Sequence, residues 1–368
     1  MLHLDATFSY SFPALRGIQA GKEFYVVMCP LKLIPKIFLF NEEEIPPEFR
    51  AQRTLNRSRI PEIANYILDN PKDYVFSSLT ASVDGEMRFQ PYTDNPEFSS
   101  LGRLFISLEA RFLINDGQHR RAAIEEALKV SPELGQENIS VVFFRDEGLR
   151  RSQQIFADLN RHAVNTTSSL GILYEHRDQL ANLTKEIVQR IPLLERYTDK
   201  EKQTLSKLSP KIFVLSNIFN TNSRILGKKK GDLVSEQEKQ FLFDFWCEVC
   251  DSVIEWNSVL NKRISPAQLR ASFVNAHGIF LEALGVVGNY LYHNHPTDWK
   301  DKVRKLSEID WSRSNSEWLG RAFGHTGRIS KNSHTIQLTA NLIKQKLGLP
   351  LSESELEMEE MLRAGESQ

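Results

Sequence analysis

The sequence is poor in cysteine and has no long apolar run. Three cysteines among 368 residues cannot build a framework of disulfides, so we expect reduced thiols and a cytoplasmic protein. The most apolar stretch, from Phe24 to Phe40, is interrupted by prolines and lysines, which predicts two strands and a turn rather than a membrane helix. Because 41% of the residues are apolar and 25% are charged, the composition is typical of a globular protein with no membrane partner.

Net charge is also nearly absent. The 46 basic and 47 acidic side chains give a net charge of −1, which excludes a protein that is basic overall. Any contact with nucleic acid must therefore come from a local basic patch, because attraction to phosphates depends on the local field. The chain has no Gly-x-x-x-x-Gly-Lys-[Ser/Thr] motif, so it is not a P-loop enzyme.

Strand and helix patterns alternate in the first half of the chain, which predicts a mixed α/β layer within an α+β protein. Apolar and β-branched runs predict strands at 24–28, 34–40, 74–83, 87–89, 104–114 and 139–144. Helical spacing predicts helices at 59–68, 120–129 and 149–159, whereas 9–17 is expected to be an opening loop. The turn signal Asp84–Gly85 would pair 87–89 with the strand before it.

From about residue 166 helical patterns dominate. They predict an all-helical domain with helices at 168–190, 199–220, 235–261, 266–293, 299–307, 315–322 and 332–347. We therefore expect a first domain at 1–170, a helical domain at 171–350, and an acidic tail at 351–368 that frays or extends.

A polar turn lies between a predicted strand and a predicted helix, with the sequence Asp116–Gly117–Gln118–His119–Arg120–Arg121. Such a turn presents free backbone N–H groups to an anion, and Gly117 lets the backbone approach closely. Arginines in the first turn of a helix oppose its dipole. Arg120 and Arg121 therefore favour a phosphate held between them over a merely solvated basic turn.

Two residues of this turn have more than one interpretation. Asp116 either holds a divalent metal beside a triphosphate or caps the helix that follows. His119 acts as an acid, a base or a hydrogen-bond donor, or it is structural. Asp116 and His119 are therefore the candidate catalytic residues.

The motif Asp116–Gly117–Gln118–His119–Arg120 resembles the name-giving motif of the DGQHR-domain family. The chain is similar to the DndB-type members of that family, which are associated with DNA phosphorothioate (sulfur) modification. Segment 155–165 resembles the family's second characteristic block, and 53–68 resembles an arginine-bearing helix near the start of the domain. The resemblance covers residues from about 10 to 175 and implies a ParB/sulfiredoxin-like first domain.

Several functional expectations come from this resemblance. It implies that ATP, with or without Mg²⁺, binds at the turn, because ParB-like relatives bind a nucleotide there. It implies that Asn160 faces this ligand, although a helix C-cap accounts for the same segment. It also implies a transcriptional repressor of a phosphorothioate-modification gene cluster. Slow hydrolysis of the nucleotide is a separate hypothesis, for which the only candidate general bases are Asp116, His119 and Glu125.

Other polar groups have both a structural and a functional interpretation. Arg53 and Arg57 are four residues apart and would share one helix face, directed at phosphate or at solvent; Arg57 is assigned to the nucleotide site. The segment 165–168 either contacts a ligand or caps the next helix.

The cysteines also allow two interpretations. Cys247 and Cys250 lack a second metal-ligand pair, so core packing is favoured and no metal site is predicted. Cys29 is either a buried apolar residue, which is favoured, or a thiol partly activated by nearby lysines.

Basic residues recur in the second half of the chain. The loop 228–230 and the run 320–334 are rich in bases, and no Asp or Glu occurs from 318 to 352. This composition suits phosphate contacts with DNA, although a solvated loop has the same appearance. The candidate DNA contacts are Lys228, Lys229, Lys230, Arg321, Arg328 and Lys331.

These observations lead to one main hypothesis and two alternatives. The main hypothesis is a regulator that binds double-stranded promoter DNA, as a homo-oligomer, with an affinity modulated by ATP at the turn. The first alternative is a metal-dependent nuclease or nickase, which needs a carboxylate cluster where the sequence offers only Asp116, Glu125 and Glu126. The second is a non-catalytic subunit that binds other DNA-modification proteins.

Overall fold

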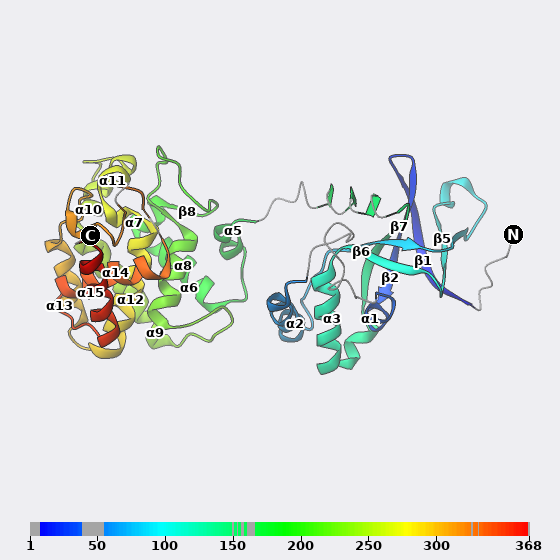
Figure 1. Ribbon diagram of the computed structural model, residues 1–368, viewed down its shortest axis with the longest axis horizontal. Coiled ribbons are helices and arrows are strands. Elements are labelled where there is room, and N and C mark those ends of the chain that lie inside the picture. Colours follow the sequence, from blue (N-terminus) through cyan, green and yellow to red (C-terminus); the bar gives the residue numbers. More distant parts are fainter. Residues whose placement is uncertain are drawn as a thin grey trace. The chain divides into compact units, whose positions relative to one another are not determined.

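The computed structural model describes residues 8–38, 55–148, 151–152, 154–155, 158–159, 166–324, 327–329 and 331–366. The chain separates into two compact units, Met1–Val164 and Asn165–Gln368 (Figure 1). Each unit has its own hydrophobic core. The first unit combines a sheet with helices and the second is mainly helical, which confirms the predicted fold class.

The first unit is built on a seven-stranded sheet in the order β4-β5-β1-β2-β7-β3-β6. Neighbouring strands are antiparallel except β3 and β7, which run parallel. The strands are β1 (Ser9–Gln19), β2 (Lys22–Pro30), β3 (Leu79–Asp84), β4 (Met87–Pro91), β5 (Leu101–Ser107), β6 (Arg111–Asp116) and β7 (Asn138–Arg145).

The labelled helices in the described part of this unit are α1 (Ile34–Ile37), α2 (Ile60–Asp69) and α3 (Gln118–Val130). Helices α2 and α3 pack against each other. The end of α1 is anchored in the core by Phe38, whose ring contacts those of Phe112 and Phe143. This anchor fixes the backbone carbonyls of α1 beside α3.

Two predictions for the start of the chain are wrong. The expected opening loop 9–17 forms most of β1, and Pro13 is tolerated because pairing with β2 begins only at Ala14. The expected strand 34–40 begins with helix α1, because a short buried apolar run does not distinguish a strand from a helix. Residues 39 and 40 lie outside the described part.

The strand pairing also differs from the prediction. Strand β4 pairs with β5 and not with β3, although a turn signal joins β3 to β4. The expected strand 104–114 is two strands: β5 lies between β4 and β1, whereas β6 pairs with β3 at the opposite edge. Within the expected strand 74–83, residues 74–78 are not in a strand. Of 149–159, the six described residues are helical.

The second unit consists of helices and one short parallel pair of strands, β8 (Thr198–Asp199) and β9 (Phe213–Val214). Its helices are α5 (Ser168–Leu173), α6 (Gln179–Arg190), α7 (Pro192–Tyr197), α8 (Leu215–Leu226), α9 (Glu236–Ser252), α10 (Ile254–Leu260), α11 (Pro266–Ser272), α12 (Gly278–Asn294), α13 (Trp299–Arg304), α14 (Ser333–Lys346) and α15 (Glu353–Glu366). Within the described ranges, none of the helices combines the length and apolarity needed to cross a bilayer.

Helix α12 lies in the core of this unit and packs against α8 and α14. A Cβ added at Gly285 would lie 2.9 Å from the Arg224 Cβ and 3.1 Å from the Thr221 carbonyl oxygen of α8. The two helices therefore approach closely because position 285 has no side chain.

Several predictions for the second unit need correction. The expected helix 315–322 contains only a 3-10 turn, Ser316–Trp318, and the expected helices 168–190 and 266–293 are interrupted at 174–178 and 273–277. The expected helix 199–220 is instead β8, a segment without helix or strand, β9 and the start of α8. The expected fraying tail is wrong for 353–366, which forms α15 and packs against α14. The acidic composition concealed this helix because Glu355 and Glu359 are buried and paired with Lys344 and Arg321.

Candidate anion-binding sites

The polar turn of the first unit joins β6 to α3 through Gly117. Gly117 has φ 104° and ψ 15°, and a Cβ there would lie 2.3 Å from the Leu79 Cδ2, so this position requires glycine. No side chain of the described residues caps α3, so the capping interpretation of Asp116 is wrong. Within the part of the chain that the structure describes, the first backbone N–H groups of α3 therefore lack a side-chain cap, which is the condition for anion binding at a helix start.

Arg120 holds the turn together. Its guanidinium donates to the Asp116 carboxylate at 2.6 Å and to the carbonyls of Ser77 and Ser78. Asp116 therefore balances the charge of Arg120, and the pair ties α3 to the segment that enters β3. This arginine is available to a phosphate only if it leaves part of that network.

Arg121 has a structural role, which contradicts its predicted place in a phosphate clamp. The side chain is buried, and its Nε donates to the Phe38 carbonyl at 2.9 Å. Its other nitrogens donate to the Pro35 carbonyl at 3.3 Å and the Glu125 carboxylate at 2.6 Å. Successive helix positions point about 100° apart, so Arg121 turns toward α1 while Arg120 faces β3.

His119 links the turn to the start of α2. The Asn56 N–H donates to His119 Nε2 at 3.0 Å, so the proton of the neutral ring is on Nδ1. Burial, and then the charge of Arg59, lower the pKa of His119. Arg57 and Arg59 belong to an exposed 3-10 turn before α2. The structure therefore brings Arg57 and the turn into one neighbourhood.

Several predicted site residues cannot be placed. Arg53, Asn160, Arg161, His162 and Asn165 lie outside the described residues. Thr167 is described, and its hydroxyl accepts from the Leu170 N–H at 3.2 Å. This confirms the capping interpretation for Thr167.

The basic residues predicted to contact DNA have different environments. Arg321 is wrongly assigned: only 11% of its side chain is exposed, it forms a two-pronged ion pair with Glu359, and it donates to the Leu338 carbonyl at 3.1 Å. Lys228 is half-buried and pairs with Glu238 at 3.1 Å. Lys229 and Arg328 are exposed.

The other two predicted lysines carry ion pairs but keep exposed side chains. Lys230 pairs with Glu175 at 2.8 Å while 71% of its side chain is exposed. Lys331 pairs with Glu282 at 2.8 Å while 40% of its side chain is exposed.

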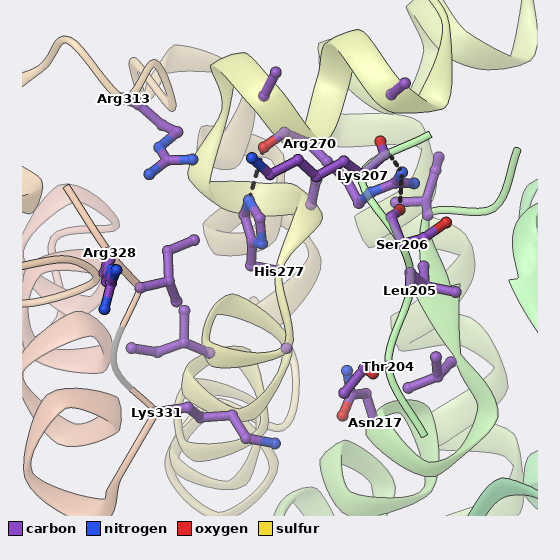
Figure 2. Close-up of a pocket in the computed structure, with 18 of the residues that line it drawn as sticks. Thr204, Leu205, Ser206, Lys207, Asn217, Arg270, His277, Arg313, Arg328 and Lys331 are labelled. Carbon is purple, nitrogen blue, oxygen red and sulfur yellow. Dashed lines mark hydrogen bonds between the residues drawn. The ribbon is translucent and has the colours of Figure 1, made fainter. Parts of the chain in front are cut away.

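A cavity of about 920 Å³ lies in the second unit among these basic segments. Figure 2 shows Arg313, Arg328 and Lys331 on one wall and Lys207 and Thr204 on the facing wall. Arg270 and His277 also line it, and no Asp or Glu is among the described residues of its lining. A neighbouring cavity of about 510 Å³ shares Gln203, Thr204, Asn217 and Lys331 with it, and it also contains Lys230.

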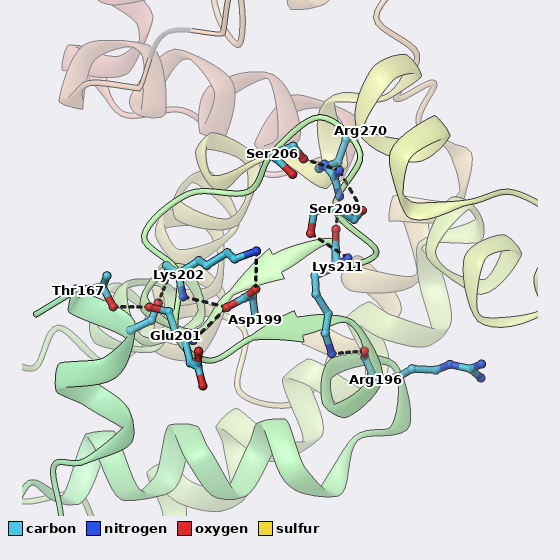
Figure 3. A network of polar contacts seen from close by, with 10 residues as sticks. Thr167, Arg196, Asp199, Glu201, Lys202, Ser206, Ser209, Lys211 and Arg270 are labelled. Atoms are coloured by element: carbon cyan, nitrogen blue, oxygen red, sulfur yellow. Dashed lines mark hydrogen bonds and ion pairs between the residues drawn. The ribbon is translucent and has the colours of Figure 1, made fainter.

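The segment from 200 to 212 forms one wall of the larger cavity without being helix or strand. Arg270 donates to the carbonyls of Ser206, Lys207, Ser209 and Lys211, and Lys211 donates to the Arg196 carbonyl at 2.7 Å (Figure 3). Asp199 accepts from the N–H groups of Glu201 and Lys202. The sequence does not single out Lys207 and Arg270, because each is an isolated base within a segment predicted to be helical.

The cysteines have structural roles. Cys250 lies in the core of the second unit and Cys247 packs against it, which confirms the core interpretation. Cys29 is fully buried, and burial raises the pKa of its thiol to about 12. The activated-thiol interpretation of Cys29 is therefore wrong. Among the described residues, no group of three or more His, Cys, Asp or Glu side chains could hold a metal ion.

A comparison with family profiles matches residues 12–350 to DndB, described as DNA-sulfur modification-associated. The chain belongs to the DndB family. No curated protein and no solved structure matches it. Membership in the DndB family connects the protein with DNA sulfur modification.

The DndB match spans both units. It contains the turn at Gly117, the loop 228–230 and the cavity lining up to Lys331, and it ends before α15. The resemblance seen in the sequence, which covered the first part of the chain, is confirmed and extends through the helical unit.

Proposed function

We propose that this DndB-family protein is a DNA-binding transcriptional regulator, a repressor of the gene cluster of a DNA sulfur-modification system. ATP bound at the turn around Gly117 would modulate its affinity for promoter DNA. The observation that carries the DNA-binding part is the convergence of two basic segments in the second unit. Lys230, from the loop after α8, and Lys331, from the segment before α14, line the same cavity.

The exposed cations of this region suit contact with DNA phosphates. Lys229 and Arg328 are exposed, and the pairs of Lys230 and Lys331 are partly exposed. Exposed ion pairs contribute only about 0–1 kcal/mol, so Lys230 can exchange its carboxylate for a phosphate at little cost. When Lys331 leaves the buried carboxylate of Glu282, that carboxylate keeps Arg224 as a partner at 2.8 Å. Such contacts position a protein on DNA without reading its sequence.

The nucleotide part of the proposal relies on the uncapped start of α3. Gly117 permits close approach of the phosphates, and the α3 N–H groups can donate to them. His119 would supply its Nδ1–H, and Arg57 and Arg59 would add positive charge from the turn before α2. Arg120 would position the turn through Asp116, and Mg²⁺ would accompany the triphosphate.

ATP changes DNA affinity only if it binds two conformations of the protein unequally. The test is fluorescence anisotropy of the duplex upstream of the gene, titrated with protein with and without ATP–Mg²⁺. We expect saturable binding, stronger than to a scrambled duplex and shifted by ATP. The variant Lys229→Ala/Lys230→Ala should weaken promoter binding both with and without ATP, whereas His119→Ala should remove only the effect of ATP.

Two results would contradict the proposal. Equal binding to the promoter and the scrambled duplex would exclude a specific repressor and favour a non-catalytic subunit of the modification system. Promoter binding that ATP leaves unchanged would retain the DNA-binding function and exclude nucleotide control at the turn.

A further inference from the structure

The larger cavity of the second unit carries positive charge that its lining does not balance. Five cations line it, namely Lys207, Arg270, Arg313, Arg328 and Lys331, and no carboxylate among the described lining residues opposes them. A cavity of about 920 Å³ is within the range of sites for small molecules, about 300–1,000 Å³. Duplex DNA presents its phosphates on a wide convex surface, which does not fit such a cavity.

These cations are not equally available to a ligand. Arg270 donates its hydrogen bonds to backbone carbonyls, and Lys331 is paired with Glu282. Lys207 and Arg328 are exposed, and their side chains make no hydrogen bond or ion pair with the described residues. Arg313 donates one bond to the Gly327 carbonyl and stacks over Phe323, which orients the rest of its guanidinium.

The start of α12 opens into the same cavity, because Ala276, His277, Gly278 and Ile279 all line it. Its first helical hydrogen bond is from the Phe280 N–H to the His277 carbonyl, at 3.0 Å, so the preceding N–H groups have no intrahelical acceptor. A Cβ at Gly278 would lie 2.6 Å from the Asn217 amide nitrogen. Because glycine has no side chain, this amide can lie at the start of the helix. These donors add to the attraction for an anion.

The remaining lining is apolar. Leu205, Ile212, Val214, Ile279 and Ile329 contribute side chains to the wall. A ligand for this cavity therefore combines a multiply charged anion with a flat or apolar group. A nucleotide has both parts: phosphates for the cations and a base for the apolar wall.

We propose that this cavity is a second, separate ligand site and binds a nucleoside polyphosphate. The phosphates lie against Lys207, Arg313, Arg328 and the start of α12 beside Asn217, and the base lies among the apolar residues of the lining. This inference does not rest on the turn in the first unit, but the cavity shares Arg328 and Lys331 with the proposed DNA contact.

The test is isothermal titration calorimetry of the full-length protein with ATP, tripolyphosphate and adenosine. The cavity variant is Lys207→Ala/Arg313→Ala, and its matched control is Arg196→Ala/Arg263→Ala, which removes two exposed cations of the same unit outside the cavity. We expect the cavity variant to weaken ATP binding at one site about tenfold or more, because charge-assisted hydrogen bonds to phosphate are lost. The control and His119→Ala should leave that site unchanged.

Each other outcome overturns the inference in a distinguishable way. If His119→Ala abolishes all ATP binding and the cavity variant abolishes none, the nucleotide binds only at the turn. If ATP does not bind the wild type, nucleotide binding at both the turn and the cavity is excluded, whereas the proposed DNA binding is not affected. Tripolyphosphate binding as tightly as ATP would mean a site for phosphate chains rather than nucleotides. Displacement of ATP by promoter duplex, with loss of DNA binding in the cavity variant, would assign the cavity to DNA.

Discussion

Arg321 and Arg328 lie seven positions apart in one basic segment but have opposite roles. Most of the Arg321 side chain is covered and pairs with the buried Glu359, whereas Arg328 is exposed at the cavity. Arg321→Ala leaves a buried carboxylate without its partner, and we expect it to lower the free energy of unfolding by about 3–5 kcal/mol. Arg328→Ala should change it by about 0.5 kcal/mol or less. Urea unfolding of both variants measures the difference.

If Arg328→Ala lowered the free energy of unfolding more than Arg321→Ala, α15 would not cover Arg321 in solution. A second comparison separates loss of charge from loss of packing. Glu359→Gln keeps the shape of the side chain and leaves Arg321 as the unpaired partner, so it should also destabilise. Promoter affinity, measured under folding conditions, should fall in Arg328→Ala and not in either variant of the buried pair.

His277 makes the stability of the second unit depend on pH. Burial lowers its pKa to about 4, and Arg313 and Arg270 add to the effect. An unfolded histidine has a pKa of about 6.5, so the unfolded chain takes up the proton first as the pH falls. Neutral His277 contributes at most about 3 kcal/mol to the free energy of unfolding. This contribution is complete above about pH 6.5 and is lost as the pH falls from that value to about pH 4.

The His277→Gln variant tests this dependence, because its amide nitrogen can still donate to the Arg270 carbonyl as His277 Nε2 does. We expect the unfolding free energy of the variant to decline less than that of the wild type from pH 7 to pH 4. His293→Gln, at an exposed position, is the control and should follow the wild type. Parallel curves for all three proteins would mean that His277 titrates normally.

Among the elements, those with a clear local period were predictable and those defined by distant partners were not. The runs that form α3, β7 and α14 were found near their observed bounds. The separate places of β5 and β6 follow from pairing with β1 and β3, which local periodicity does not record. Segment 200–212 has helical periodicity, but Arg270 binds its backbone carbonyls and stabilises another conformation.

The candidate sites show the same limit. The turn was found because its motif is contiguous in the sequence, and its glycine conformation could be anticipated. The burial of Arg121 could not be anticipated, because its acceptors, the carbonyls of Phe38 and Pro35, lie far away in the chain. The cavity was missed for a related reason, since Lys207 and Arg313 come together only through the packing of α11 and α12 with their neighbouring segments.

Helix α15 is an element whose removal should be costly. It supplies Glu355 to Lys344 and Glu359 to Arg321, and all four side chains are largely buried. A chain that ends at Leu351 keeps both cations and loses both carboxylates. We expect unit Asn165–Gln368 to lose several kcal/mol of stability, with about 3–5 kcal/mol for each broken buried pair as the upper range. Thermal unfolding followed by circular dichroism measures the loss; an unchanged midpoint would contradict this account of α15.

On the scale of the whole molecule, a net charge of −1 conceals an uneven distribution. Acids neutralise the arginines of the turn in the first unit, whereas the larger cavity of the second unit has five cations and no carboxylate among its described lining residues. Screening shortens the reach of charges to about 8 Å at physiological ionic strength, so a phosphate near this cavity responds to the local cations. The near-zero total is therefore compatible with binding a polyanion.

The salt dependence of DNA binding tests this view of the whole molecule. Each phosphate contact releases counterions, so the logarithm of the affinity falls with the logarithm of salt concentration, with a slope of about −0.9 per contact. Removing Lys229 and Lys230 should reduce the slope by about 1.8 if each contacts one phosphate. The matched Lys239→Ala/Lys262→Gly variant changes two other lysines of the same unit and should keep the wild-type slope. If both double variants lose slope equally, Lys229 and Lys230 are not specific phosphate contacts. A net charge of −1 makes attraction through the overall field a poor explanation, so another basic surface must then carry the contact.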